Sequence, residues 1–249
     1  MSTIRTARTT GAFYLALAVT GMLGFLVLRP RLFTSDAAET LGNLADNQAL
    51  AHSVVLLEML IVISQATTAV WFFKLFRTIN PVAAFATAAF GLVNAVAIMM
   101  SAAFLTTAIA VASDQPLVPG GNAAGSVGLL QQLSESSWGM GNLFFGLWLI
   151  PMGWAAIEHG RFPKALGALL IAGGAGYLVS ALLHHGVAGI PTTLADSPAY
   201  IATVAEFWMI GYLLTVGIRP QRQPETTTHG AHGAPPFTAT RLDQPSPIR

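Results

Sequence analysis

Two acidic residues, Glu58 and Glu206, lie inside long apolar stretches of the sequence. A charged side chain at the centre of a bilayer costs about 2.5–3.5 kcal/mol on insertion scales, so such an acid faces the bundle interior, carries a proton or has a partner. Each glutamate lies seven residues into its stretch. At 1.5 Å per helical residue, this corresponds to a depth of about 10 Å. We therefore expect both carboxyls in the outer half of a membrane, as sites for a proton or a cation.

Other polar side chains occur near the same level. Asn142 lies near the start of the fourth apolar stretch, Asn94 near the middle of the third, and His184 ends the fifth. Gln65 is seven residues from Glu58, so the two share one helix face. Together with the two glutamates, these residues form the predicted site, which is an outward-facing polar pocket for a proton, an ion or a small solute in a transporter- or sensor-like protein.

Two alternative functions stay open. His52, His184 and His185 supply imidazoles, which suit zinc, copper and haem iron. However, the chain has no HExxH motif, and the adjacent His184 and His185 diverge by about 100° on a helix, so we expect neither a metal nor another cofactor. The other alternative is a structural or accessory membrane protein that acts through contacts with a protein partner the sequence does not identify.

Enzymatic chemistry finds little support among the residue patterns. The chain has no cysteine, which excludes disulfides, thiolate metal sites and cysteine nucleophiles. It also has no nucleophile elbow, no phosphate-binding loop and no catalytic pair of aspartates. We therefore expect that the protein is not an enzyme.

The elements that must position the polar side chains are transmembrane helices. Hydrophobic residues make up 53% of the chain and charged residues only 9%, whereas a soluble domain carries about 25% charged residues. The net charge of +1 does not suit a nucleic-acid-binding face. The composition predicts a multi-pass membrane protein whose environment is the lipid bilayer, with no nucleic-acid partner.

Six apolar stretches each approach the roughly 20 residues that cross a bilayer as a helix. They are Gly11–Leu28, Ala51–Phe73, Ala83–Val111, Trp138–Ile157, Ala165–Leu183 and Ala199–Ile218. Arg29-Pro30-Arg31 follows the first stretch in place of a small-residue cleavage site, so we expect a retained helix and not a signal peptide. The sequence predicts an all-α bundle of six transmembrane helices over residues 1–219. Glycines at helical spacing, such as Gly146 and Gly153, predict close helix packing.

The distribution of Lys and Arg predicts the orientation, because cytoplasmic loops are enriched in both. One side of the predicted bundle carries ten of the twelve: Arg5, Arg8, Lys74, Arg77, Arg161, Lys164, Arg219, Arg222, Arg241 and Arg249. The other side carries only Arg29 and Arg31. We expect both termini in the cytoplasm and the protein in a bacterial inner membrane.

The connections differ in character. Ser35-Asp36-Ala37-Ala38-Glu39 is a capping-box pattern, which predicts a short surface helix through about Asn47. The outer connection over residues 112–137 has Pro-Gly turn chemistry and no helical periodicity around Pro119-Gly120-Gly121, so we expect a loop. Residues 220–249 are rich in proline and contain almost no apolar run, which is typical of a disordered tail on the cytoplasmic side.

Several short motifs occur along the chain, together with Glu58 and Glu206. They are Arg8-x-x-Gly11, Arg77 near Asn80, Phe162-Pro163-x-x-Leu166-Gly167, Gly176-Tyr177-Leu178 and Gly217-Ile218-Arg219. In their order and spacing, residues 5–219 resemble a bacterial family of six-helix integral membrane proteins known as domain of unknown function 4386. The resemblance implies a six-helix membrane fold. It implies no activity, so no catalytic residues are transferred.

Overall fold

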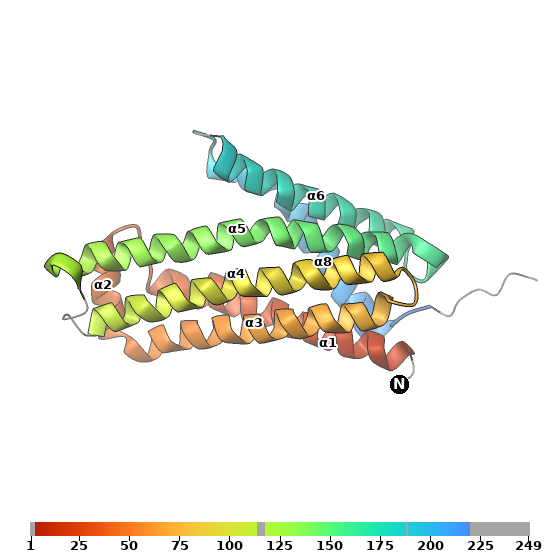
Figure 1. Ribbon diagram of the computed structural model, residues 1–249, viewed down its shortest axis with the longest axis horizontal. Helices are drawn as coiled ribbons and strands as arrows, with labels where there is room; N and C mark the ends of the chain where they lie inside the picture. The colour runs from red at the N-terminus through yellow and green to blue at the C-terminus, as the bar shows by residue number, and fades with distance from the viewer. Residues whose placement is uncertain (1–2, 114–117, 188, 220–249) are drawn as a thin grey trace, which may run out of the picture.

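The computed structural model describes residues 3–113, 118–187 and 189–219, and all regular structure in these ranges is helical. The α-helices are α1 (Thr3–Met22), α2 (Ala37–Asp46), α3 (Gln48–Phe76), α4 (Pro81–Ser113), α5 (Ala123–Ile157), α6 (Lys164–Gly186), α7 (Thr192–Asp196) and α8 (Tyr200–Thr215). Figure 1 shows the long helices packed side by side, with α6 leaning away from α5 toward one end. The predicted all-α class is confirmed. The predicted tail over residues 220–249 lies outside the described residues.

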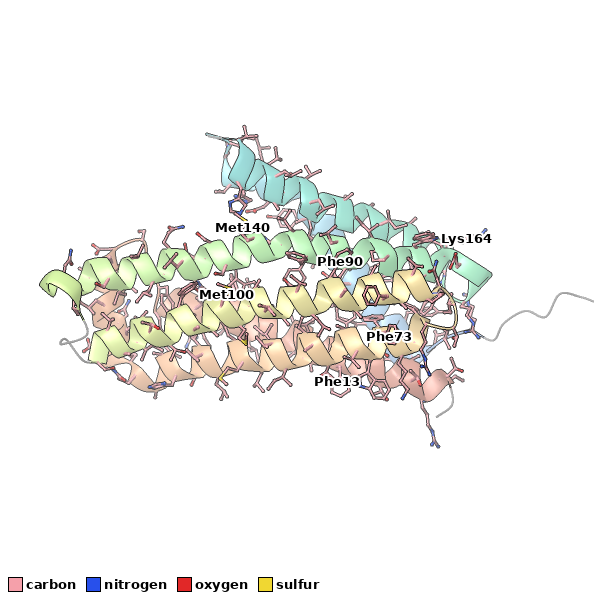
Figure 2. The ribbon with its side chains drawn as sticks, viewed as in Figure 1. Phe13, Phe73, Phe90, Met100, Met140 and Lys164 are labelled. Carbon is pink, nitrogen blue, oxygen red and sulfur yellow. The ribbon has the colours of Figure 1, made fainter. Side chains whose placement is uncertain are left out.

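Five helical segments are long and apolar enough to cross a bilayer: Thr3–Arg31, Gln48–Phe76, Pro81–Ser113, Ala123–Ile157 and Lys164–Gly186. Their outward faces expose large apolar side chains, for example Leu26 (71% exposed) and Val82 (69%). Figure 2 shows Phe73, Met100 and Met140 on the outside of the bundle. Lipid tails cover such surfaces, and helices satisfy their own backbone polar groups in hydrocarbon. The chain is therefore a multi-pass membrane protein. The sixth predicted stretch becomes α8, a shorter helix of 16 residues that packs against α1 and α6.

The expected loop over residues 112–137 is wrong for most of its length, because α5 begins at Ala123. Asn122 caps this helix, and its side-chain oxygen accepts a hydrogen bond from the Gly125 N–H at 2.8 Å. Val127 is buried in an apolar cluster with Leu44 of α2 and other side chains. Tertiary packing thus stabilises helical turns whose polar composition resembles a loop.

The predicted short surface helix is α2, which packs on α3, α4 and α5. The residue that caps α2 is Asp36, whose carboxylate accepts hydrogen bonds from the N–H groups of Ala38 at 2.7 Å and Glu39 at 3.3 Å. These bonds satisfy two of the backbone donors that a helix leaves free at its N-terminus. The cap fixes where the chain turns after the first span.

The first span changes its winding before it ends. A π-helical segment, Leu23–Leu28, follows α1, and a 3-10 turn, Arg29–Arg31, follows that segment. We expected Arg29 in an outer connection, but its side chain is inside the bundle and the residue is only 6% exposed. π-Helical turns are rare and occur frequently at functional sites.

Glycines bring α5 and α6 into backbone contact, as predicted. A Cβ atom on Gly146 would lie 2.7 Å from the carbonyl oxygen of Gly174, and one on Gly153 would lie 2.5 Å from that of Gly167. Small residues are favoured at such helix interfaces because they allow the backbones to approach closely. This contact is in the N-terminal half of α6, so α6 can diverge from α5 at its other end (Figure 1).

Candidate functional site

A cavity of about 830 Å³ lies between α1, α5, α6 and α8. It extends from Phe25, His184 and His185, near the ends of their helices, to Tyr14 and Glu206 near the middle of the bundle. Its volume is within the range of about 300–1,000 Å³ that is common for small-molecule sites. Most lining side chains are apolar or aromatic, and a few polar groups are placed among them.

Glu206 of α8 is the acid at the inner end of this cavity. The hydroxyl of Tyr14 on α1 donates a hydrogen bond of 2.7 Å to its Oε1 atom, and Tyr177 of α6 interacts with the same carboxyl. The Tyr14 ring is itself fixed by edge-on contacts with Phe72 at 5.5 Å and Trp148 at 5.4 Å between ring centroids. Side chains from two other helices therefore hold this carboxyl in place, and in the described part of the chain it forms no ion pair.

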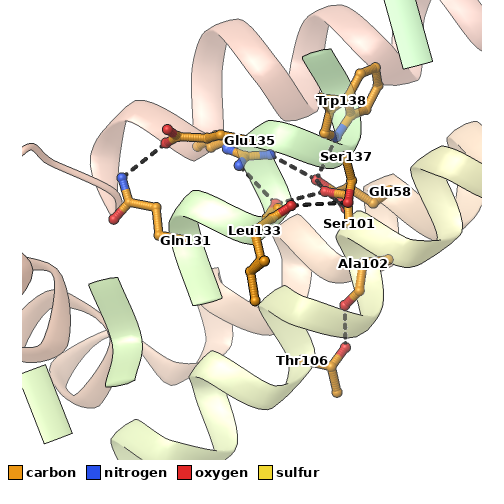
Figure 3. Close-up of polar contacts among 11 residues, drawn as sticks. Glu58, Ser101, Ala102, Thr106, Gln131, Leu133, Glu135, Ser137 and Trp138 are labelled. Atoms are coloured by element: carbon orange, nitrogen blue, oxygen red, sulfur yellow. Dashed lines mark hydrogen bonds and ion pairs between the residues drawn. The ribbon is translucent and has the colours of Figure 1, made fainter. Parts of the chain in front are cut away.

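Glu58 of α3 has different surroundings. Its Oε1 atom forms an ion pair with Arg29 Nη1 at 3.1 Å, and the residue is 1% exposed. The Ser101 hydroxyl lies 3.3 and 3.1 Å from its two oxygens, and the Trp138 ring N–H donates to Oε1 at 3.3 Å. Figure 3 shows these contacts converging on one carboxylate. Glu58 therefore has a counter-charge, and both of its carboxylate oxygens have hydrogen-bond partners.

Arg29 completes this buried network. Its Nη2 atom donates to Ser134 Oγ at 2.9 Å, and Ser134 lies 2.7 Å from Ser101. The guanidinium also lies over the rings of Phe25 at 4.9 Å and Phe33 at 5.6 Å. The network joins the end of the first span to α3, α4 and α5, so it ties these helices together at that level of the bundle.

Trp138 connects the network to the cavity. Its N–H contacts Glu58, while its ring lines the cavity and meets Phe25 at 4.6 Å and Phe145 at 6.4 Å between centroids. Phe145 in turn stacks on Tyr177 at 5.8 Å. We call these four side chains, Phe25, Trp138, Phe145 and Tyr177, the aromatic wall. All four line the cavity.

The six residues of the predicted site separate into two groups. Glu206, Asn142 and His184 line the cavity. The other three, Glu58, Gln65 and Asn94, lie in the bundle interior and do not line it.

The two buried amides, Gln65 and Asn94, lie in the bundle interior and do not line the cavity. The Gln65 side chain donates to the Gly91 carbonyl oxygen at 3.3 Å. Its own oxygen and both polar atoms of the Asn94 side chain have no hydrogen-bond partner within the described part of the chain. Buried polar atoms are nearly always paired with protein or ordered water. These unpaired amide atoms are therefore unusual, and they are separate from the cavity.

The histidines do not assemble into one cluster. His184 Nε2 lies 2.6 Å from Asp196 Oδ1, which joins α6 to α7. His185 lines the cavity, whereas His52 is exposed near the start of α3 and does not line it. The described residues contain no group of three or more His, Cys, Asp or Glu side chains placed to hold a metal ion.

Sequence reasoning missed Tyr14, Arg29 and the aromatic wall. One signal was present, because Trp138 and Phe145 are seven residues apart and so share a helix face. The partner of Glu58 had no such signal, because Arg29 belongs to another helix, 29 residues earlier in the chain.

Comparison with known proteins gives one match. The sequence model of a family described as "Domain of unknown function (DUF4386)" matches residues 9–217. This match covers most of the chain and confirms the resemblance seen in the sequence motifs. No curated protein and no solved structure matches the chain.

Proposed function

Since the chain belongs to the DUF4386 family, a domain of unknown function, we propose its function from its own cavity: it binds a small solute or a proton from the outer side of a bacterial inner membrane. The observation that carries this proposal is the Glu206 carboxyl, which faces a cavity of about 830 Å³ and is held by the Tyr14 hydroxyl. An acid inside a membrane is costly, so its position points to a role in binding.

Glu206 is the better binding group of the two intramembrane acids. Glu58 already has Arg29 as counter-charge and hydrogen bonds from Ser101 and Trp138. A second cation at Glu58 would have to displace that guanidinium. Glu206 has only neutral hydroxyl partners among the described residues, so its carboxylate can accept a proton or a cation.

The proposal includes six spans, with both termini in the cytoplasm and α8 as the sixth span. Ten of the twelve Lys and Arg residues would then lie on the inner side, as the positive-inside rule requires. Under this orientation the end of the cavity at Ser136 and His184 opens outward. α8 is short for a membrane span, but the 3-10 turn Ser197–Ala199 continues directly into it and lengthens the helical segment.

Cysteine labelling tests the outward opening, because the chain contains no natural cysteine. Ser136 lines the cavity, so a Ser136→Cys variant should react with a membrane-impermeant maleimide added to intact cells. A matched control, Ser180→Cys, replaces a serine that is buried in α6 and should not react. Reaction of Ser136→Cys only after the cells are permeabilised would contradict the outward-facing cavity.

A further inference from the structure

The lining of the cavity narrows the class of solute, on the assumption that the proposed function holds. We propose that the cavity binds an amphipathic organic cation, with its charge beside Glu206 and its apolar part along the aromatic wall. Three features of the described residues support this: the continuity of the aromatic wall, the sign of the charges around the cavity, and the apolar side chains near Glu206.

The aromatic wall forms an unbroken series of ring contacts across three helical segments. It begins at Phe25 in the π-helical segment, crosses Trp138 and Phe145 of α5, and ends at Tyr177 of α6. Tyr177 also interacts with the Glu206 carboxyl. The negative faces of aromatic rings attract cations, and cages of such rings are a common way to bind quaternary ammonium groups. The wall therefore places aromatic rings next to the carboxyl.

The charges around the cavity favour a positive ligand. Among the described residues that line it, Glu135 and Glu206 are acidic and none is a lysine or an arginine, while the two histidines, His184 and His185, lie at the end of the cavity away from Glu206. The Arg29 guanidinium, which belongs to the buried network and does not line the cavity, is already bound to Glu58 and Ser134. A ligand carboxylate or phosphate beside Glu206 would therefore lie next to a like charge with no lysine or arginine to balance it, which is strongly unfavourable in a low dielectric.

The apolar side chains near Glu206 favour an organic ion over a bare metal ion. Leu17, Ile61, Phe207 and Ile210 face the cavity beside the aromatic wall. Such side chains offer no oxygen or nitrogen ligands, whereas they match the methyl and aryl groups of an organic cation. Burial of that apolar surface supplies affinity, and Glu206 supplies the selection for charge.

A pair of nearly isosteric probes tests the proposal. Benzyltrimethylammonium carries a quaternary nitrogen, and neopentylbenzene has the same shape with a neutral carbon in its place. We expect the purified full-length protein to bind the cation at least tenfold more tightly than the neutral probe, by calorimetry or tryptophan fluorescence. Glu206→Gln should weaken binding of the cation at least tenfold and leave the neutral probe unchanged. The control Glu39→Gln replaces an exposed residue of α2 that does not line the cavity and should change neither affinity.

A second variant keeps the proposal testable if Glu206→Gln does not fold. Phe145→Leu retains an apolar side chain but removes one ring of the aromatic wall. This variant should therefore weaken binding of the cation several-fold more than binding of the neutral probe. Equal affinities for both probes, unchanged by either variant, would overturn the assignment to cations while leaving the solute-binding cavity in place. If neither probe binds and Ser136→Cys is unreactive from outside, the proposed function fails as well.

Discussion

At the scale of single residues, the two intramembrane glutamates have opposite surroundings. Glu58 is paired with Arg29 and has hydrogen bonds to Ser101 and Trp138, so its charge is balanced within the bundle. Glu206 has hydroxyl partners and faces a cavity. The same residue type in two apolar stretches thus has a structural role in one helix, and in the other we propose that it binds a ligand.

The buried pair leads to a stability prediction. Glu58→Gln leaves the Arg29 guanidinium buried without a counter-charge, and breaking a buried ion pair in this way costs about 3–5 kcal/mol. We expect that loss in the free energy of unfolding, measured by denaturant titration in detergent micelles. Replacing both partners, Arg29→Met with Glu58→Leu, should be less destabilising than Glu58→Gln alone. A loss below about 1 kcal/mol in the single variant would show that the pair does not hold the bundle together.

At the scale of elements, the close contact of α5 and α6 keeps one end of this helix pair together while the cavity occupies the other. Gly153 and Gly167 meet through their backbones. The divergence of α6 from α5 (Figure 1) provides room for the aromatic wall and for Glu206. Gly153 and Gly167 therefore contribute to the shape of the cavity without lining it.

This contact can be tested with a single methyl group. Gly153→Ala places a Cβ atom 2.5 Å from the Gly167 carbonyl oxygen, and such overpacking costs about 1–3 kcal/mol. We expect a lower midpoint of thermal unfolding for this variant. The matched control is Gly211→Ala in α8, where an added Cβ meets nothing within 4 Å. Equal midpoints for the two variants would refute the backbone contact.

Hydropathy alone could locate the long helices, because a lipid-facing helix is apolar along its own length. The start of α5 could not be located in this way. Residues such as Gln131 and Ser134 form hydrogen bonds to Thr34 and Arg29, which belong to distant parts of the chain. These partners exist only in the folded bundle, so the local sequence resembles a loop. The candidate site could be predicted only in part, because helix periodicity shows which residues of one helix share a face. It does not show which residues of two different helices meet.

At the scale of the whole molecule, the proposed outward-facing cavity requires a fixed orientation of the bundle in the membrane. The connection after the first span carries Ser35, and the connection between α3 and α4 carries Thr78, both exposed. With both termini in the cytoplasm, these residues are on opposite sides of the membrane. The orientation rests on the excess of Lys and Arg near the ends of the helices on one side.

Labelling of intact cells checks this orientation. Ser35→Cys should react with an impermeant maleimide added from outside, and Thr78→Cys should react only after permeabilisation. The natural absence of cysteine makes each variant its own single-site probe. The reverse pattern would invert the topology and place the mouth of the cavity on the cytoplasmic side.

The most direct test of a cation site at Glu206 combines access and occupancy. Thr203 lines the cavity on α8, three residues before Glu206, so a Thr203→Cys variant reports on the site itself. We expect benzyltrimethylammonium to slow labelling of this cysteine by an external impermeant maleimide at least tenfold, and to have no effect once Glu206→Gln is added. Equal protection with and without the Glu206 carboxyl, or no protection in either, would contradict the account.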